Sequence, residues 1–121
     1  MTKVVVQNSL FISIHMNAFP QSQYSGLQVY YSPNHPASQQ LARDIQELTK
    51  SALQPENNRS IKAAGENIFL LDRLTCPAVL VECGFLSNGE ECEALADENY
   101  QRQLALVIAL SILQNLSPPS S

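Results

Sequence analysis

Cysteine is scarce in this sequence, and its spacing does not favour pairing. The three cysteines, Cys76, Cys83 and Cys92, are an odd number and show no CxxC spacing. The sequence therefore argues against a disulfide framework and against a structural zinc knuckle. Because cysteine is among the residue types most often buried, we expect all three to be core or half-buried residues.

Positive charge and long apolar runs are also lacking. Seven Lys or Arg stand against eleven Asp or Glu, which gives a net charge of −4 without any basic cluster. Since basic clusters hold phosphate backbones, we expect no nucleic-acid partner. The longest strongly apolar run, residues 104–113, falls short of the roughly 20 residues that a bilayer requires. We therefore expect no membrane span. Only three consecutive apolar residues follow Lys3, which is too short for the apolar region of a signal peptide, so we expect no signal peptide in this chain.

The composition is that of a folding chain. Of the 121 residues, 45% are hydrophobic and 15% are charged, which allows a core large enough to offset the ordering entropy. The length fits one domain. We expect residues 1–116 to form it and residues 117–121, with the sequence SPPSS, to be a disordered tail.

Short β-rich runs alternate with helical ones along this domain. Strands are predicted at residues 10–14, 26–31, 68–71 and 78–81, and long helices at residues 37–53 and 97–116. The first and last strands are apolar throughout, which favours strands covered on both faces. The pattern predicts an α/β fold, with a mainly parallel, mixed sheet of about four strands between helices, two of them long.

Three local patterns refine the helices. Residues Leu41, Ile45, Leu48 and Ala52 form one stripe of the first long helix and should pack on the sheet. Residues 104–113 are apolar nearly all round, so we expect that part of the last helix to be well buried. Ser87 and Asn88 resemble the N-cap of a further helix, with Glu90 and Glu91 in its first turn.

Two polar residues follow apolar strands directly. His15 comes after the run at 10–14, and Glu82 comes after the run at 78–81. The carboxyl ends of parallel strands meet at one edge of a sheet, where ligands bind, so we expect both side chains at one site. A neutral imidazole is a good zinc ligand, and a carboxylate nearby can act as the general base for a metal-activated water. The alternative is that both residues are structural and hydrogen-bonded.

Other residues are weaker candidates. Asn17, Tyr30, Arg73 and Asn88 are the candidate substrate-binding residues. Tyr30 could line a groove for sugar or peptide, or cover a sheet edge. Arg73, after the predicted strand 68–71, could bind a substrate carboxylate or pair with a nearby acid. Gly84 would let the backbone and a ligand approach closely.

Three motifs in this order resemble those of the zinc-dependent N-acetylmuramoyl-L-alanine amidases. They are residues 11–18 (FISIHMNA), residues 25–31 (SGLQVYY) and residues 77–88 (PAVLVECGFLSN). Residues 20–26 (PQSQYSG) are similar to the spore-cortex, germination-specific branch of that family. The resemblance extends from about Asn8 to Leu116.

The resemblance implies hydrolysis of the amide between N-acetylmuramic acid and L-alanine in peptidoglycan, in the cell wall or another extracytoplasmic location. It implies that His15 is a zinc ligand and that Glu82 is the catalytic carboxylate. Members of the family carry two earlier zinc ligands, a His and a Glu, but the fourteen residues before His15 contain neither. The resemblance therefore implies that residues 1–116 are the C-terminal part of an amidase domain that lacks its N-terminal third.

Such a partial domain is expected to be inactive alone, because catalytic zinc takes three protein ligands. It would also have a free sheet edge, through which it could form a homodimer. Two alternatives stay open at this point. One is a non-enzymatic peptidoglycan-binding or interaction module on the amidase scaffold, and the other is an unrelated α/β domain.

Overall fold

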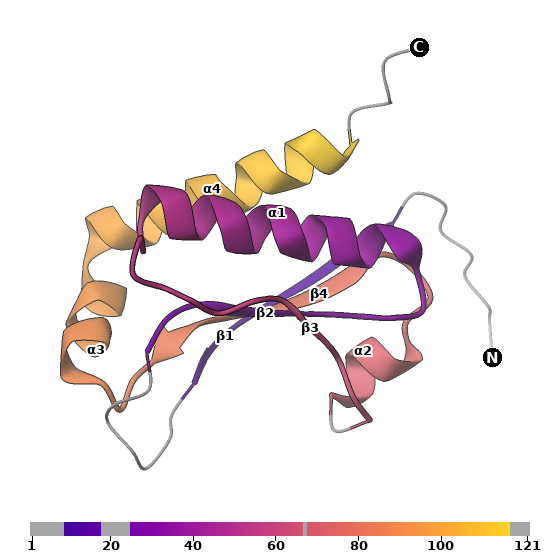
Figure 1. The fold of residues 1–121 in the computed structure, drawn as a ribbon, viewed down its shortest axis with the longest axis horizontal. Coiled ribbons are helices and arrows are strands. Elements are labelled where there is room, and N and C mark those ends of the chain that lie inside the picture. The colour runs from indigo at the N-terminus through magenta and orange to yellow at the C-terminus, as the bar shows by residue number, and fades with distance from the viewer. Residues whose placement is uncertain (1–8, 18–24, 67, 117–121) are drawn as a thin grey trace.

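The computed structural model describes residues 9–17, 25–66 and 68–116, and these contain one four-stranded sheet (Figure 1). Its order is β1-β4-β2-β3, in which β1 is parallel to β4, β2 is antiparallel to β4, and β2 is parallel to β3. The elements in chain order are β1 (Phe11–Asn17), β2 (Gln28–Tyr31), α1 (Pro36–Ala52), β3 (Lys62–Ala63), α2 (Phe69–Arg73), β4 (Ala78–Phe85), α3 (Gly89–Ala96) and α4 (Glu98–Leu116).

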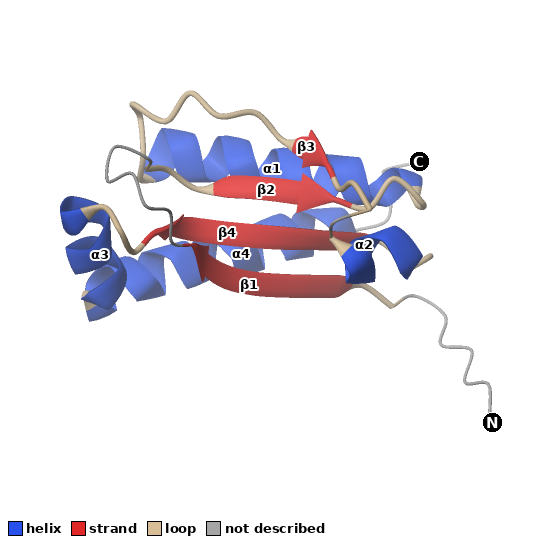
Figure 2. Ribbon diagram, turned by 90° about the horizontal axis from the view of Figure 1, so that it is seen from below, coloured by secondary structure: helices blue, strands red, loops and turns tan. Residues whose placement is uncertain are grey.

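The two faces of the sheet are covered unequally. The long helices α1 and α4 lie side by side on one face, while the short helix α2 lies on the other (Figures 1 and 2). The main core is on the side of the long helices and includes Val79 and Val81 of β4, both fully buried. A smaller cluster around Leu71 and Ala78 fills the space under α2. The predicted fold class, a mixed sheet of four strands flanked by helices, is confirmed.

The alternation of β4 explains how one strand serves both faces. Every second side chain of a strand lies on the same face of the sheet. Accordingly, Val79, Val81 and Cys83 all belong to the core under the long helices. Leu80 packs instead with the cluster under α2. Glu82 is two residues further along, so its side chain lies on that second, less covered face.

One predicted strand is wrong. Residues 68–71 do not form a strand: Phe69–Arg73 is the helix α2. A four-residue apolar run does not distinguish a strand from a buried helical turn, and here the helical spacing decides. Ile68, Leu71 and Leu74 are three residues apart and pack together on the sheet, while Leu70 is exposed. The strand β3 lies earlier, in a polar stretch for which no strand was predicted.

The predicted burial of three segments needs correction. Helix α4 begins and ends close to the prediction, but it is not buried all round, since Leu106, Leu110 and Leu113 are 59%, 44% and 60% exposed. Cys92 is exposed on α3 rather than half-buried. On α1, Leu41 and Ile45 are buried as predicted, but Leu48 is only half-buried and Ala52 is exposed. The other buried positions of α1 are Ala42 and three polar residues, Ser38, Gln46 and Thr49.

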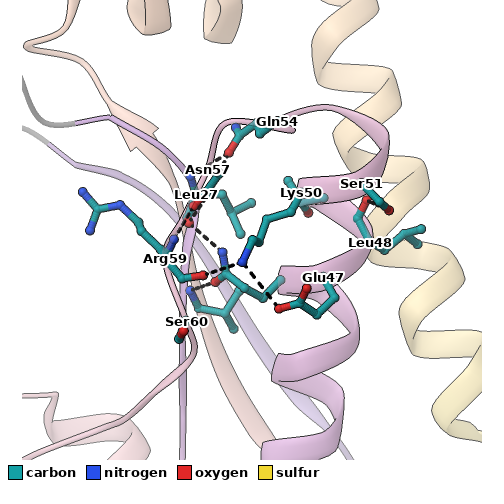
Figure 3. A network of polar contacts seen from close by, with 12 residues as sticks. Leu27, Glu47, Leu48, Lys50, Ser51, Gln54, Asn57, Arg59 and Ser60 are labelled. Carbon is teal, nitrogen blue, oxygen red and sulfur yellow. Dashed lines mark hydrogen bonds and ion pairs between the residues drawn. The ribbon is translucent and has the colours of Figure 1, made fainter.

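The strand β3 pairs only with Tyr30 and Tyr31 of β2. Ahead of these two residues, side-chain amides close the edge of β2 that faces away from β4 (Figure 3). The Leu27 N–H donates to Gln54 Oε1 and the Val29 N–H donates to Gln46 Oε1, each over 3.0 Å. The Leu27 carbonyl accepts from Gln46 Nε2 and from Asn57 Nδ2, also over 3.0 Å. Backbone groups of a buried strand need partners, and here helix α1 and the loop after it supply them.

Two further observations concern the ends and the surface of the chain. No described helix has the length and hydropathy needed to cross a membrane. The predicted tail at 117–121 and residues 20–24 of the germination-type motif at 20–26 lie outside the described residues.

Candidate functional site

His15 and Glu82 lie side by side. They are register partners in the parallel pair β1–β4, so their side chains emerge from adjacent strands on the same face of the sheet. Both stand near the carboxyl ends of their strands, just before the register shift between His15 and Asn17. The structure therefore brings together the two residues that sequence reasoning expected at one site.

The environment of Glu82 differs from that of an ordinary surface carboxylate. Burial raises the pKa of its carboxyl above the ordinary value, and the neighbouring His15 lowers that pKa by a smaller amount. Its Oε2 atom is buried and has no hydrogen-bond partner among the described residues. A carboxyl group whose proton is held more tightly than usual suits proton transfer near neutral pH.

A third polar residue, Gln28, is in register with this pair. His15, Glu82 and Gln28 thus form a row across three adjacent strands. It is the register partner of Glu82 on the other side of β4, and it is only 2% exposed. Its Nε2 donates to the Ser60 carbonyl over 2.6 Å and to the Val29 carbonyl over 3.3 Å, which fixes the orientation of the amide. Its Oε1 has no partner in the described part of the chain. Sequence reasoning missed Gln28, because only the strand register shows that it flanks Glu82.

The imidazole of His15 is exposed and has a close neighbour on its own strand. Its Nε2 lies 2.5 Å from the Ser13 hydroxyl, and the tautomer decides which of the two donates. Since Ser13 and His15 are two residues apart, they lie on the same face of β1. This contact orients the ring beside Glu82.

Two of the predicted substrate-binding residues lie near this row. Tyr30 is half-buried on β2, two residues from Gln28 and hence on the same face, and it packs on the cluster under α2. Asn17 pairs in register with Phe85 at the end of β1, and its side chain is outside what the structure describes.

The other two differ in their positions: Arg73 lies far from Glu82, and Asn88 has a structural contact at the start of α3. Arg73 belongs to α2, which leads into the amino end of β4 and lies at the end of the sheet opposite Glu82 (Figure 2). The strand on which its substrate role was predicted does not exist. Asn88 is the N-cap of α3, where its Oδ1 accepts from the Glu91 N–H over 3.1 Å. The predicted N-cap is thus confirmed.

The described residues do not by themselves fit a catalytic zinc ion. Such a site takes three protein ligands and a water, and within residues 9–17, 25–66 and 68–116 no group of three His, Cys, Asp or Glu side chains could hold a metal. His15 offers one nitrogen donor with a carboxylate beside it. A pocket of about 530 Å³ lies at the opposite end of the sheet, near Cys76 and His35, and is remote from this chemistry.

The comparison with known families decides the relationship. The N-acetylmuramoyl-L-alanine amidase family matches residues 3–114. The chain belongs to this family. The match covers all three motifs that carry the resemblance in the sequence.

Individual amidases are similar over most of this chain. The germination-specific N-acetylmuramoyl-L-alanine amidase of Bacillus subtilis (strain 168) is 34% identical over 105 residues, which is 87% of this chain and 44% of that protein. The CwlD amidase of Clostridioides difficile, solved with the GerS lipoprotein, is 43% identical with a TM-score of 0.84, over 91% of this chain and 56% of that one. The amidase AmiC2 of Nostoc punctiforme is 30% identical with a TM-score of 0.77, over 88% and 57%. The chain thus spans about half the length of these amidases.

Proposed function

We propose that this chain contributes the catalytic carboxylate of an amidase that cleaves the bond between N-acetylmuramic acid and L-alanine in peptidoglycan, outside the cytoplasm. The observation that carries the proposal is the register pair His15 and Glu82, on a chain of the amidase family. The similarity to a germination-specific amidase supports a role in the spore cortex.

Glu82 has the central role in the proposed reaction. Its carboxylate takes a proton from the attacking water and returns that proton to the nitrogen of L-alanine as the amide bond breaks. Burial raises the pKa of the Glu82 carboxyl, which favours its protonated form between these two transfers. Gln28 and His15 are the register partners of Glu82 on the two adjacent strands and so flank it on either side.

His15 is proposed as one ligand of a zinc ion. The other ligands would come from outside the described residues, because those residues contain no three-ligand group. We therefore expect the chain alone to hydrolyse no amide and to bind zinc weakly.

The decisive experiment supplies the other part of the domain. The N-terminal part of the Bacillus subtilis relative is fused ahead of this chain, and newly formed L-alanine amino termini are measured on purified peptidoglycan with added zinc. We expect activity from the fusion protein, a loss of about 10²–10⁴-fold in Glu82→Gln, and no loss in the matched exposed control Glu93→Gln. Full activity in Glu82→Gln would remove the catalytic assignment.

A second function is favoured by the lack of a three-ligand group within residues 9–17, 25–66 and 68–116. A chain that supplies one imidazole could keep the scaffold as a non-enzymatic module that binds peptidoglycan. A folded, zinc-loaded fusion protein that releases no L-alanine termini, together with a chain that sediments with peptidoglycan, would favour this module over the hydrolase.

We also propose that the chain pairs with a second copy through β1. Within the described residues β4 is the only neighbour of β1, and Ile14 and Met16 on this strand are 58% and 51% exposed. An uncharged, unpaired edge favours self-association. Sedimentation velocity over a range of concentrations tests this proposal, and a monomer at every concentration would contradict it.

A further inference from the structure

A single carboxylate joins the ends of the two strands that carry Gln28 and Glu82. Glu91, on the first turn of α3, accepts a hydrogen bond from the Phe85 N–H on Oε1 over 2.6 Å. Its other oxygen, Oε2, accepts from the Gly26 N–H over 2.8 Å. Gly26 and Phe85 are far apart in the sequence, and one stands before β2 while the other ends β4.

The position of this bridge is set by the register of the strands. Gln28 and Glu82 are the last pair of the antiparallel ladder at this end of the sheet. Beyond them the strands are joined through the Glu91 side chain rather than through backbone hydrogen bonds of the ladder. An ionised carboxylate only accepts hydrogen bonds, so two N–H donors on two oxygens make a strong and well-oriented link.

Glycines at two positions permit the bridge, Gly84 through the space that it leaves and Gly26 through its backbone conformation. A Cβ atom on Gly84 would lie 2.1 Å from Glu91 Oε1, so a side chain there would displace the carboxylate. Gly26 has a φ of +96°, which L-amino acids with side chains rarely adopt. The close approach that Gly84 allows is therefore to the carboxylate of Glu91, rather than to a ligand as the sequence suggested.

A cation strengthens the same junction. The Arg59 guanidinium lies 5.0 Å from the centroid of the Phe85 ring, and its Nε donates to the Ser25 carbonyl over 2.9 Å. Arg59 thus contacts the same two strand ends as Glu91. Two independent side chains therefore hold these ends together.

We infer that Glu91 is a positioning residue, which holds the carboxyl end of β4 against the start of β2 and so places the Glu82 carboxylate beside Gln28. The inference rests on the proposed function for its importance in catalysis, but its geometry can be tested without activity. Phe85 is three residues from Glu82 on the same strand, so a shift at Phe85 is transmitted to Glu82 through an extended backbone.

The experiment is a nuclear magnetic resonance comparison of the chain with Glu91→Ala, Glu91→Gln and the exposed control Glu93→Ala. In Glu91→Ala we expect amide hydrogen exchange at Gly26 and Phe85 to be about 10-fold faster or more. We also expect the Glu82 carboxyl and Gln28 side-chain signals to move. Glu91→Gln keeps one acceptor oxygen, so its changes should be intermediate.

The outcomes separate this inference from the proposed function. Unchanged exchange and unchanged Glu82 and Gln28 signals in Glu91→Ala would overturn the inference, whatever the fusion protein does. Changes confined to Gly26 and Phe85, with the Glu82 signal unmoved, would also overturn it, because they show a structural bridge that does not position the carboxylate. If Glu91 moves Glu82 but Glu82→Gln leaves the fusion protein active, the positioning stands and the proposed reaction fails.

A second set of variants remains informative if Glu91→Ala is poorly folded. Gly84→Ala should lower the midpoint of urea unfolding, since its methyl group collides with Glu91. In a chain that already carries Glu91→Ala this collision is absent. Gly84→Ala should therefore lower the midpoint of urea unfolding less in that background than it does in the wild type. Additive losses would overturn the close packing of these two residues.

Discussion

Two strand edges in the sheet differ in how their backbone groups are treated. At the start of β2, ahead of the two residues that pair with β3, the edge is closed: Gln46, and the Gln54 and Asn57 side chains seen in Figure 3, provide the hydrogen bonds that a longer β3 would have made. At the β1 edge, no described side chain has a comparable role, and Ile14 and Met16 lie exposed beside it.

Within the described residues, the start of β2 thus has partners for its backbone groups, and the free edge of β1 does not. A strand edge that is covered by its own chain cannot recruit another strand, whereas an open one can. His15 lies on the open edge, so whatever pairs with β1 also comes close to the candidate site. The candidate ligand His15 and the open edge are therefore on the same side of the described structure.

The largest effect is expected from breaking the closed edge. Gln46→Leu removes both hydrogen bonds to Leu27 and Val29 and leaves the buried Val29 N–H without its acceptor. We expect the free energy of unfolding to fall by about 2–4 kcal/mol in urea denaturation. Gln39→Leu, exposed on the same helix, should change it by less than about 0.5 kcal/mol. Equal stability of the two variants would show that the amides do not close this edge.

A substitution at the open edge should change association rather than stability. Ile14→Lys places a charge on an exposed position of β1, which opposes pairing with a second copy. We expect the dissociation constant of the dimer to rise roughly 10-fold. The unfolding free energy should stay within about 0.5 kcal/mol of the wild-type value. Sedimentation velocity and urea denaturation measure the two quantities, and unchanged association would place the contact elsewhere.

The pair next to the open edge predicts a pH dependence. Because burial raises the folded-state pKa of Glu82 above 4.5, the folded chain holds this proton more tightly than the unfolded chain does. The resulting stability is fully present below pH 4.5 and is lost as the pH rises through the raised pKa. Glu82→Gln cannot lose a proton, so its unfolding free energy should increase relative to that of the wild type between pH 4 and pH 7. A constant difference over this range would contradict the shift.

A further prediction concerns a thiol in the apolar groove beside Ile14 and Met16. Burial, followed by the negative charge of Glu82, raises the pKa of the Cys83 thiol to about 11, and Cys83 is only 3% exposed. At pH 8 it should react with a thiol reagent about 100-fold or more slowly than the exposed Cys92. The variant Cys83→Ser lacks the reaction phase of this thiol, so comparison with it identifies that phase in the time course. If a second copy covers the groove, that phase should slow further as the protein concentration rises.

Local sequence patterns predicted the elements whose signals are contained within a few residues. Such local patterns predicted the strand β4 from its continuous apolar run, the two long helices, the Asn88 N-cap and the membership of the amidase family. The two stripe positions Leu41 and Ile45 were also correct, since a period of 3.6 identifies the buried side of a helix.

The predictions were wrong where contacts with residues distant in the sequence determine the local structure or burial. The run at 68–71 is helical because Leu71 fits against Ala78, and nothing inside four apolar residues specifies that packing. Gln46 is buried because the start of β2 needs its amide. The outward leucines of α4 were expected in the core because hydrophobicity alone does not show how many layers surround a helix.

The amino-acid sequence by itself determined the secondary structure of the long elements, the family and the two residues of the candidate site, because periodicity and motifs are short-range properties. The tertiary structure alone decided that Gln28 flanks Glu82 and that Glu91 joins the ends of β2 and β4. These contacts depend on strand register and on the packing of α3, which are fixed only when distant segments meet.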